Sequence, residues 1–165
     1  MAEPTASRPH MPGYGIAGPD EGTGLLPWSW AVDRLGRSHD YWVTSVWPDG
    51  RPHTMPVWGV WLDDALWFSS SVGSRKARNL TGDPRCTVAT DDAQEPVVVE
   101  GRAAIVRDLP TIEHFLEHSN AKYETSYEVD FLDPDTNATI RVTPARAIGL
   151  VEADFTASPT RWTFT

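Results

Sequence analysis

Hydrophobic and polar residues alternate along much of the chain, which is the spacing of half-buried β-strands. The pattern predicts strands over residues 41–47, 53–62, 65–70, 86–90, 96–106, 139–152 and 160–164. Tight turns at 48–51 and 63–64 join the first three strands, which we therefore expect to form an antiparallel meander. Pro144 cannot donate a hydrogen bond within a sheet, so the strand over 139–152 is expected at a sheet edge or with a bulge.

Three segments instead repeat their apolar residues every three or four positions, which is the period of a helix. They predict short helices over 28–35, over 74–81 and from about residue 108 onward. The expected buried face of the third helix consists of Ile112, Phe115 and Leu116, with Ser119 at its margin. Residues 120–137 are acidic and irregular, with one further short helix expected.

The predicted helices do not alternate regularly with the strands, which argues against a doubly wound parallel sheet. We expect a mainly β fold with short helices, in the form of a closed or split antiparallel β-barrel of six or seven strands. A chain of 165 residues has the length of one domain. Residues 28–165 are assigned to the barrel, and the Pro- and Gly-rich residues 1–27 to a flexible N-terminal arm or a strap over a neighbour.

The number of cysteines and the length of the apolar runs indicate the cellular compartment of the protein. No apolar run approaches the length that spans a bilayer, and residues 1–27 lack the apolar centre of a secretory signal. The single cysteine, Cys86, excludes an internal disulfide. It lies in an alternating strand, where we expect a small buried residue rather than a reactive thiol. These features predict a cytoplasmic protein.

The charge and the aromatic content restrict the partners. A formal net charge of -9 and a pI near 4.9 argue against nucleic acid, which requires a broad basic face. The chain contains 8 tryptophans, and indoles are enriched at interfaces and in ligand pockets. They are consistent with a homodimer or, alternatively, with a Trp-rich core.

Three cations stand together at the start of the second predicted helix, directly after Ser74. Ser74 is suited to cap the helix, whose free N–H groups and whose Arg75, Lys76 and Arg78 would surround a phosphate or carboxylate. Cations at a helix N-terminus oppose the helix dipole unless an anion is bound there. The alternative is that they form surface ion pairs with Asp83 and nearby carboxylates.

The common sequence motifs of hydrolases, metalloproteases and nucleotide-binding enzymes are absent. It contains no Gly-x-Ser-x-Gly, no His-Glu-x-x-His and no Walker phosphate loop. His114 and His118 stand one helical turn apart, as metal ligands do, but no cysteine or carboxylate cluster completes a site. We interpret the pair as a solvated helix face and expect no metal. The catalytic residues stay unassigned.

Several short motifs, taken in order, resemble one known family. They are Asp-Gly-Arg-Pro-His at 49–53, Met-Pro-Val-Trp at 55–58, Leu-Trp-Phe-Ser at 66–69, Ser-Arg-Lys-Ala-Arg-Asn-Leu at 74–80, Asp-Pro-Arg-Cys at 83–86 and Pro-Thr-Arg-Trp-Thr-Phe at 159–164. Over residues 28–165 the chain resembles the split-barrel flavoproteins related to pyridoxamine 5'-phosphate oxidase. It looks most like the branch that uses the deazaflavin coenzyme F420.

The resemblance implies a homodimer with two cofactor sites at the subunit interface. It implies that the coenzyme phosphate is held by Ser74, Arg75, Lys76 and Arg78, with Asn79 completing the cap. The ring would contact Met55, Pro56, Val57 and Trp58, and Thr44 would line its pocket. Arg161 and Trp162 would close the site from the other subunit.

The chain departs from the flavin mononucleotide (FMN) members, which carry cations on the strand that here spans 54–60. The absence of these cations favours F420 as the coenzyme, with FMN as the alternative. The acidic tail of F420 would need positive charge, for which Arg34, Arg37 and Arg51 are the candidate partners. The resemblance thus implies an F420H2-dependent oxidoreductase that passes a hydride to an electron-poor double bond of a small molecule. A carrier of F420 or haem without turnover is the second class considered. Tyr41, His53 and Tyr123 are the candidate proton donors.

Overall fold

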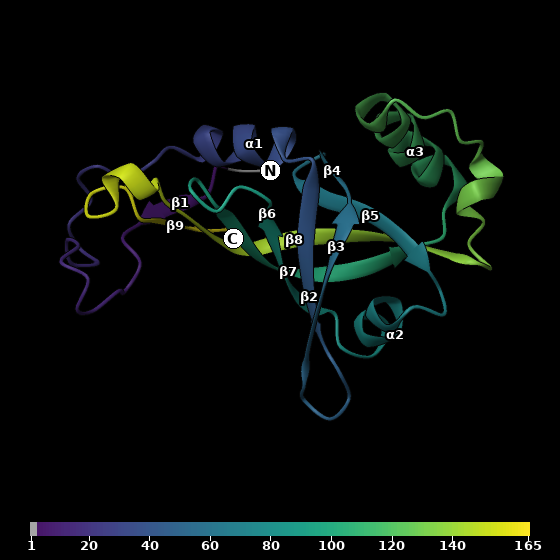
Figure 1. Cartoon of the computed structure of the whole chain (residues 1–165), viewed down its shortest axis with the longest axis horizontal. Coiled ribbons are helices and arrows are strands. Elements are labelled where there is room, and N and C mark those ends of the chain that lie inside the picture. The colour runs from purple at the N-terminus through teal and green to yellow at the C-terminus, as the bar shows by residue number, and fades with distance from the viewer. Residues whose placement is uncertain (1–2) are drawn as a thin grey trace.

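The computed structural model describes residues 3–165 as an open antiparallel sheet with three α-helices and two 3-10 helices (Figure 1). The strands are β1 (Thr5–Ser7), β2 (Asp40–Val46), β3 (Pro52–Trp58), β4 (Val60–Leu62), β5 (Ala65–Ser71), β6 (Arg85–Thr90), β7 (Val97–Val106), β8 (Asn137–Gly149) and β9 (Thr160–Thr163). The helices are α1 (Trp28–Arg37), α2 (Arg75–Gly82), α3 (Leu109–Tyr123), η1 (Val129–Leu132) and η2 (Glu152–Asp154).

The nine strands form one sheet in the order β1-β9-β8-β7-β6-β2-β3, with β5 on β8 and β4 on β5. The expected split barrel is confirmed, and the closed alternative is wrong because β3 and β1 end the sheet without pairing with each other. Nine strands replace the six or seven expected, because residues 53–62 divide into two strands and the N-terminal segment adds β1. None of the described helices is long and apolar enough to cross a membrane.

Gly59 divides the strand that the sequence presents as continuous. A Cβ atom at Gly59 would lie 2.9 Å from the carbonyl oxygen of Trp67, so only glycine allows this approach. The peptide groups of Gly59 turn to α3, where the N–H donates to the Tyr123 hydroxyl (2.8 Å) and the carbonyl accepts from Lys122 Nζ (2.8 Å). Residues before Gly59 pair with β2 and those after it pair with β5, as in the expected meander.

β8 runs through the middle of the sheet, paired with β7 on one side and with β5 and then β9 on the other. Pro144 lies between Val142, the last partner of β5, and Arg146, the first partner of β9. At the same place the register between β7 and β8 shifts next to Gly101. The expected bulge is therefore confirmed, and the expected edge position is wrong. Pro144 is accommodated at the point where the pairing partner of β8 changes from β5 to β9.

Side chains of β2 alternate between the two faces of the sheet, with Tyr41, Val43 and Ser45 buried and Trp42 on the other side 47% exposed. The buried face packs on Phe68 and Leu80, the latter from α2. α3 covers β4 and β5 with its expected face of Ile112, Phe115 and Leu116. α1 packs on Trp162, which is fully buried. Cys86 is buried as expected, and burial raises the pKa of its thiol to about 12.

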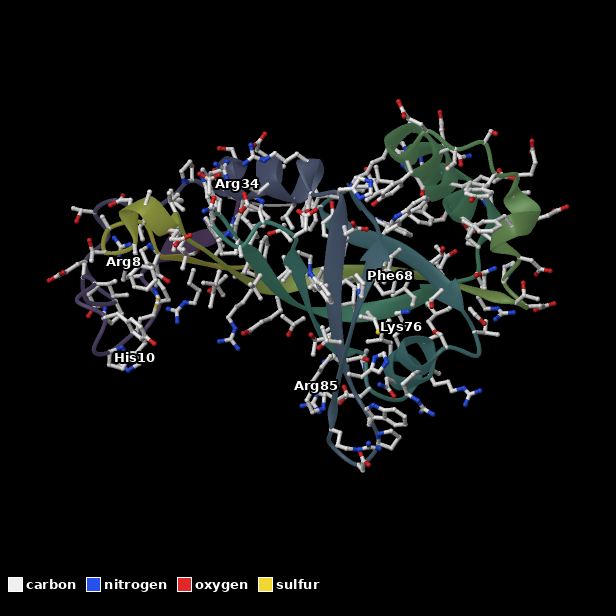
Figure 2. The ribbon with its side chains drawn as sticks, in the orientation of Figure 1. Arg8, His10, Arg34, Phe68, Lys76 and Arg85 are labelled. Atoms are coloured by element: carbon white, nitrogen blue, oxygen red, sulfur yellow. The ribbon has the colours of Figure 1, made fainter. Side chains whose placement is uncertain are left out.

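The N-terminal segment lies against the C-terminal segment of the same chain. β1 pairs with β9, and the next residue, Arg8, is fully buried. Its guanidinium donates to the carbonyls of Thr23, Ala157 (2.8 Å) and Pro159 (2.6 Å). In Figure 2, Arg8 lies with His10 at the end of the molecule remote from Lys76. The buried arginine thereby ties residues 5–23 to the loop that precedes β9.

Candidate functional site

A pocket of about 250 Å³ lies among β3, β5, α2, α3 and η1. Its lining residues come from these five elements and from the loop before η1: Pro56, Val57, Trp58, Ser69, Lys76, Phe115, Leu116, Ser119, Tyr127, Phe131 and Leu132. The pocket therefore joins the segment expected to contact a ring with one cation of the segment expected to hold a phosphate. Figure 2 shows Lys76 on α2, and its Nζ reaches Ser70 on β5 at 3.4 Å.

Ser74 caps α2 as expected, with its Oγ accepting from the N–H of Ala77 at 3.2 Å. Ser70 on β5 donates to the same oxygen at 2.9 Å. Lys76 Nζ reaches Ser70 Oγ at 3.4 Å, a long contact with a neutral group. Desolvation by partial burial lowers the pKa of Lys76. The ammonium thus lines the pocket without an ion-pair partner among residues 3–165, which favours an anionic ligand.

The three cations at the start of α2 are not neutralised by the protein. Among residues 3–165, Arg75, Lys76 and Arg78 form no ion pair, whereas Asp83 pairs with Arg85 at 2.6 Å. The alternative in which the cluster pairs with Asp83 is therefore wrong. The positive charge at this helix terminus remains available to a ligand.

Arg75 lies over the indole of Trp47, with its guanidinium carbon 3.9 Å from the ring centroid. Arg51, which also pairs with Asp49 at 2.8 Å, contacts the same indole at 4.7 Å. The tip of the β2–β3 hairpin therefore brings a fourth cation beside α2. Arg78 is exposed to solvent on the helix.

Asn79 does not complete the cap of α2. Its side chain is buried and donates from Nδ2 to Ser45 Oγ on β2 at 3.1 Å. Its Oδ1 is buried without a partner among the described residues. Asn79 thus ties α2 to the sheet through the side chain of Ser45.

Aromatic rings form two walls of the pocket. The indole of Trp58 stacks on Tyr123, with ring centroids 4.3 Å apart and planes 2° from parallel. Tyr127 and Phe131 form a second stack at 4.1 Å and 11°. From the sequence, Phe115 was expected only on the buried face of its helix, and Tyr127 and Phe131 were assigned no site, although aromatic residues in the acidic segment 120–137 were an available signal. Flat apolar walls with one cation suit a planar ligand that carries negative charge.

A network of polar contacts supports the Trp58 wall from behind. Lys122 Nζ donates to the carbonyls of Ser38 (2.6 Å) and Gly59 (2.8 Å) and to the Tyr41 hydroxyl (2.9 Å). Desolvation lowers the pKa of Lys122 to about 8, opposed by the charges of Asp91 and Asp40. All three N–H groups of Lys122 have acceptors, so this lysine holds α3 against β2 and Gly59 and is not free to bind a ligand.

The candidate proton donors do not line the pocket. Burial, with smaller contributions from Tyr123 and Asp91, raises the pKa of Tyr41, whose hydroxyl donates to the carbonyl of Leu35. Desolvation raises the pKa of Tyr123 to about 12, and its hydroxyl contacts the carbonyl of His39 at 2.6 Å. His53 Nδ1 is buried without a partner among the described residues, beside Trp47.

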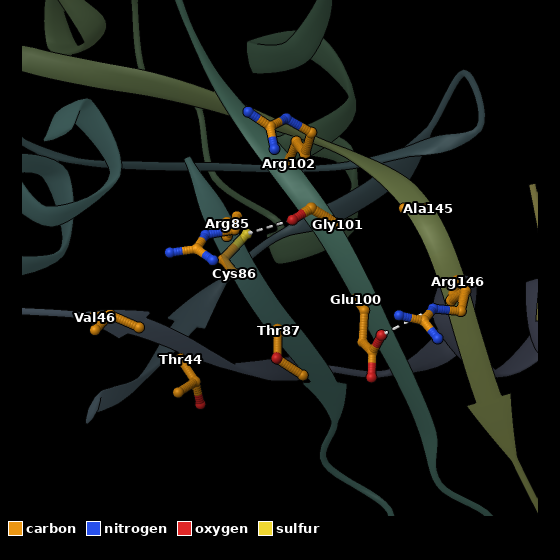
Figure 3. Close-up of a pocket in the computed structure, with 10 residues that line it drawn as sticks. All are labelled: Thr44, Val46, Arg85, Cys86, Thr87, Glu100, Gly101, Arg102, Ala145 and Arg146. Atoms are coloured by element: carbon orange, nitrogen blue, oxygen red, sulfur yellow. Dashed lines mark hydrogen bonds and ion pairs between the residues drawn. The ribbon is translucent and has the colours of Figure 1, made fainter. Parts of the chain in front are cut away.

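A second hollow, of about 480 Å³, lies over another part of the sheet (Figure 3). Its lining crosses β2, β6, β7 and β8 and includes Thr44, Arg85, Arg102 and an ion pair between Glu100 and Arg146 (3.3 Å). Thr44 therefore lines this hollow and not the aromatic pocket, and its hydroxyl contacts Thr54 at 2.9 Å.

The remaining residues predicted for the site lie elsewhere. Met55 is exposed on β3 and does not line the aromatic pocket. Arg161 on β9 donates to Ser7 Oγ at 3.1 Å. Trp162 is fully buried within the chain, and its indole N–H donates to the carbonyl of Leu26 at 3.2 Å, so its side chain does not line the aromatic pocket.

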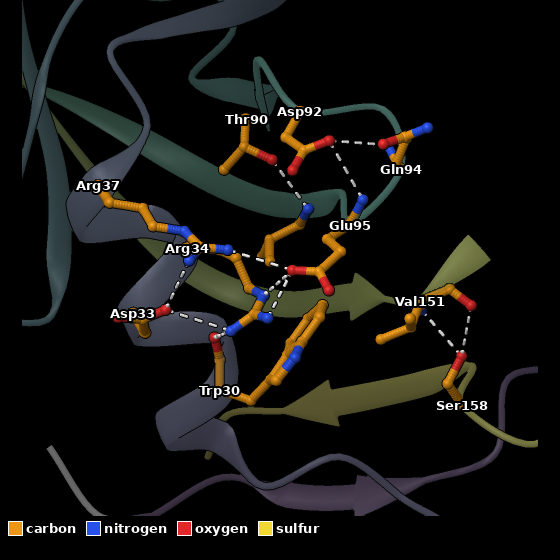
Figure 4. A network of polar contacts seen from close by, with 11 residues as sticks. Trp30, Asp33, Arg34, Arg37, Thr90, Asp92, Gln94, Glu95, Val151 and Ser158 are labelled. Carbon is orange, nitrogen blue, oxygen red and sulfur yellow. Dashed lines mark hydrogen bonds and ion pairs between the residues drawn. The ribbon is translucent and has the colours of Figure 1, made fainter. Parts of the chain in front are cut away.

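Two arginines expected to meet an acidic tail are engaged within the protein. Arg34 and Arg37 both contact the carboxylate of Glu95, at 2.5 Å and 3.1 Å, and both approach Asp33 (Figure 4). Arg34 also lies over the Trp30 ring at 4.0 Å. This network ties α1 to the loop before β7, which leaves Arg51 as the expected partner that lies beside α2.

The open sheet, with its helix-covered pocket, has the architecture of a split barrel. Residues 31–150 match the profile of the pyridoxamine 5'-phosphate oxidase family, and the chain belongs to that family. The match extends from α1 to the end of β8 and so includes the whole pocket. A comparison with curated proteins gives no match.

Solved structures with this fold differ in what their names say they bind. The chain is similar to an F420 reductase, at 25% identity and a TM-score of 0.58 over 70% of this chain and 93% of that chain. It is similar to an FAD-binding protein from Mesorhizobium loti, at 18% identity and 0.59 over 85% and 96%. It is also similar to HutZ, the haem storage protein from Vibrio cholerae, at 17% identity and 0.56 over 71% and 86%.

Proposed function

We propose that this protein is an F420H2-dependent oxidoreductase that reduces an electron-poor double bond of a small organic substrate. The supporting observation is the pocket that unites Trp58 and Pro56 with the unpaired Lys76. A reduced deazaflavin, when bound, supplies the hydride. The protein contributes binding, orientation and exclusion of water.

Each part of the pocket has a role in this proposal. Lys76, with the capped N-terminus of α2, holds the coenzyme phosphate, and Arg75, Arg78 and Arg51 supply positive charge for an acidic tail. Residues Pro56 to Trp58 hold one edge of the ring. The Tyr127–Phe131 stack closes the apolar side, where it keeps water from the reacting carbon.

The choice of F420 over FMN rests on β3. Its sequence from Pro52 to Trp58 contains no cation, whereas the resemblance implies basic residues there in the FMN enzymes. The F420 reductase is also the neighbour with the highest identity of the three described, at 25%. FMN remains the second candidate, because the FAD-binding protein shares the fold.

A homodimer is part of the same proposal. The face of β2 that carries Trp42 has an apolar row in which Pro56, which also lines the pocket, pairs with Trp42, Trp42 with Ala89, Ala89 with Val98, and Val98 with Ile148. Trp42 is 47% exposed there. A second copy of the chain on this face would cover the row. Separately, we propose that the protein acts in the cytoplasm.

Titration of the purified full-length protein with F420 and with FMN, followed by tryptophan fluorescence, tests the proposal. We expect saturable binding of F420 and weaker binding of FMN. Lys76→Ala should weaken F420 binding by about 10- to 100-fold, because a hydrogen bond to a charged group contributes roughly 1.5–3 kcal/mol. Arg107→Ala is the matched control, since Arg107 is exposed and pairs only with Asp135.

The outcomes separate the candidates. Tight FMN binding without F420 binding rejects the deazaflavin assignment, and equal affinity of the Lys76→Ala variant rejects the phosphate site. Binding of F420H2 without its oxidation by a panel of conjugated enones would favour a carrier over an enzyme. Haem binding in place of both coenzymes would favour the storage function that is named for the Vibrio neighbour.

A further inference from the structure

Three potential metal ligands stand on one side of α3, outside the aromatic pocket. They are His114, Glu117 and His118, whose ligand atoms lie within 4.8 Å of one another. The two histidines are one helical turn apart, and their ring centroids are 4.6 Å apart. Two imidazoles at this spacing on a helix can bind one metal ion.

The β4–β5 turn adds a fourth group from a distant part of the chain. Asp63 Oδ2 lies 3.1 Å from His114 Nε2. Two ligands of one tetrahedral zinc ion, at 2.0–2.1 Å from the metal, are about 3.4 Å apart. The Asp63 and His114 atoms are therefore already near the separation that a shared ion imposes. The sequence showed the histidine pair without this carboxylate, because Asp63 approaches α3 only through the fold.

A backbone contact orients the second imidazole. His118 Nδ1 is 2.9 Å from the carbonyl oxygen of His114, which can only accept, so Nδ1 carries a proton. In the neutral ring the lone pair then resides on Nε2. A ligand histidine whose other nitrogen donates to a carbonyl is the usual arrangement at metal sites, because the contact fixes both the tautomer and the ring.

We propose that His114, His118, Glu117 and Asp63 bind one divalent transition-metal ion of the zinc class. Two imidazoles with carboxylates suit Zn²⁺, Co²⁺, Ni²⁺ or Cu²⁺ rather than Ca²⁺ or Mg²⁺, which prefer oxygen ligands alone. The ion takes the place of the proton between His114 Nε2 and Asp63 Oδ2. It links α3 to the β4–β5 turn and so holds the helix that supplies Phe115 and Leu116 to the pocket wall.

Cobalt titration of the full-length protein tests this site without any coenzyme. The protein is first treated with EDTA and desalted, and visible absorbance then follows added Co²⁺. We expect one equivalent to bind and to be displaced by Zn²⁺. His118→Ala and His114→Ala should each weaken binding by at least about 10-fold, and Asp63→Asn by about 10-fold.

The chain offers a matched control. His39 and Asp40 form another exposed histidine–carboxylate pair, with Nδ1 and Oδ2 3.0 Å apart, outside the cluster. His39→Ala should bind Co²⁺ as the unaltered protein does. Zn²⁺ should raise the melting temperature of the unaltered protein and of His39→Ala, but not that of His118→Ala.

Several outcomes would overturn the site. Absence of saturable Co²⁺ binding, or equal affinity in His118→Ala, rejects the metal ion. Equal affinity in Asp63→Asn rejects the link between α3 and the β4–β5 turn. The melting temperatures without metal serve as the folding check, and we expect them to be alike because His114 and Asp63 are exposed, at 46% and 67% of their side chains.

Discussion

The indole of Trp58 lies flat on the phenol ring of Tyr123, with centroids 4.3 Å apart and planes 2° from parallel. The Tyr123 hydroxyl in turn accepts from the N–H of Gly59, the residue directly after Trp58. One tyrosine thus fixes both the ring of Trp58 and the backbone break that ends β3. The aromatic wall of the pocket depends on the C-terminal end of α3.

Loss of the Tyr123 hydroxyl should destabilise the protein while keeping the stacked rings. In Tyr123→Phe the Gly59 N–H loses its partner in a partly buried position, which costs roughly 1–3 kcal/mol. Urea unfolding at pH 7 measures the change. Tyr127→Phe is the matched control, since Tyr127 is 44% exposed and also stacked, and we expect a change below about 0.5 kcal/mol.

The same variant should alter the alkaline limb of the stability curve. Desolvation raises the pKa of Tyr123 from 10.0 to about 12, so the unfolded chain loses this proton first. The stabilisation is complete below pH 10 and is lost as the pH rises to about 12. The difference in unfolding free energy between the unaltered protein and Tyr123→Phe should therefore shrink across this window. A difference that stays constant from pH 9 to pH 12 would contradict the proposed origin.

Gly101 should tolerate no side chain at the β7–β8 bulge. A Cβ there would lie 2.6 Å from the carbonyl oxygen of Thr143 and 2.7 Å from Cγ1 of Val142. Because one of these atoms belongs to a paired backbone, Gly101→Ala should lower the unfolding free energy by at least about 1–3 kcal/mol. Gly82→Ala, with no atom within 4 Å of its Cβ, is the control in thermal unfolding. Equal melting temperatures would show that the bulge relaxes freely.

A charge on the uncovered face of the sheet should dissociate the proposed homodimer. Trp42 stands in the apolar row of that face, so Trp42→Glu would place a carboxylate in a dry contact. Sedimentation velocity should show a dimer for the unaltered protein and a monomer for the variant. Tyr14→Glu, at a 61% exposed site beside Phe155, should remain dimeric. A monomeric unaltered protein would reject this interface.

Arg8 should hold the N-terminal segment in place. Arg8→Met removes hydrogen bonds to three carbonyls, two of them close to β9, and leaves those carbonyls without their donor. Chymotrypsin should then cleave near the exposed Tyr14 faster than in the unaltered protein. Arg107→Met, which removes one exposed ion pair, should leave the rate unchanged. Equal cleavage of all three proteins would show that other contacts hold the segment.

Local features of this protein could be predicted from the sequence because their causes lie within a few residues. Ser74 caps α2 since its hydroxyl meets an N–H three positions later. Ile112, Phe115 and Leu116 face inward because helical spacing brings them to one side. The alternation in β2 likewise set which side chains are buried. These features follow from backbone geometry alone.

The tertiary structure decided what distant residues do to one another. It divided the strand at Gly59, moved Pro144 from an edge to the middle of the sheet, and turned Asn79 inward to Ser45. It brought Lys76 to Trp58 and Asp63 to His114. The sequence by itself determined most of the strands, the Ser74 cap and the positive charge at α2. Which groups face that charge depends on pairing between distant strands, and periodicity carries no information about that pairing.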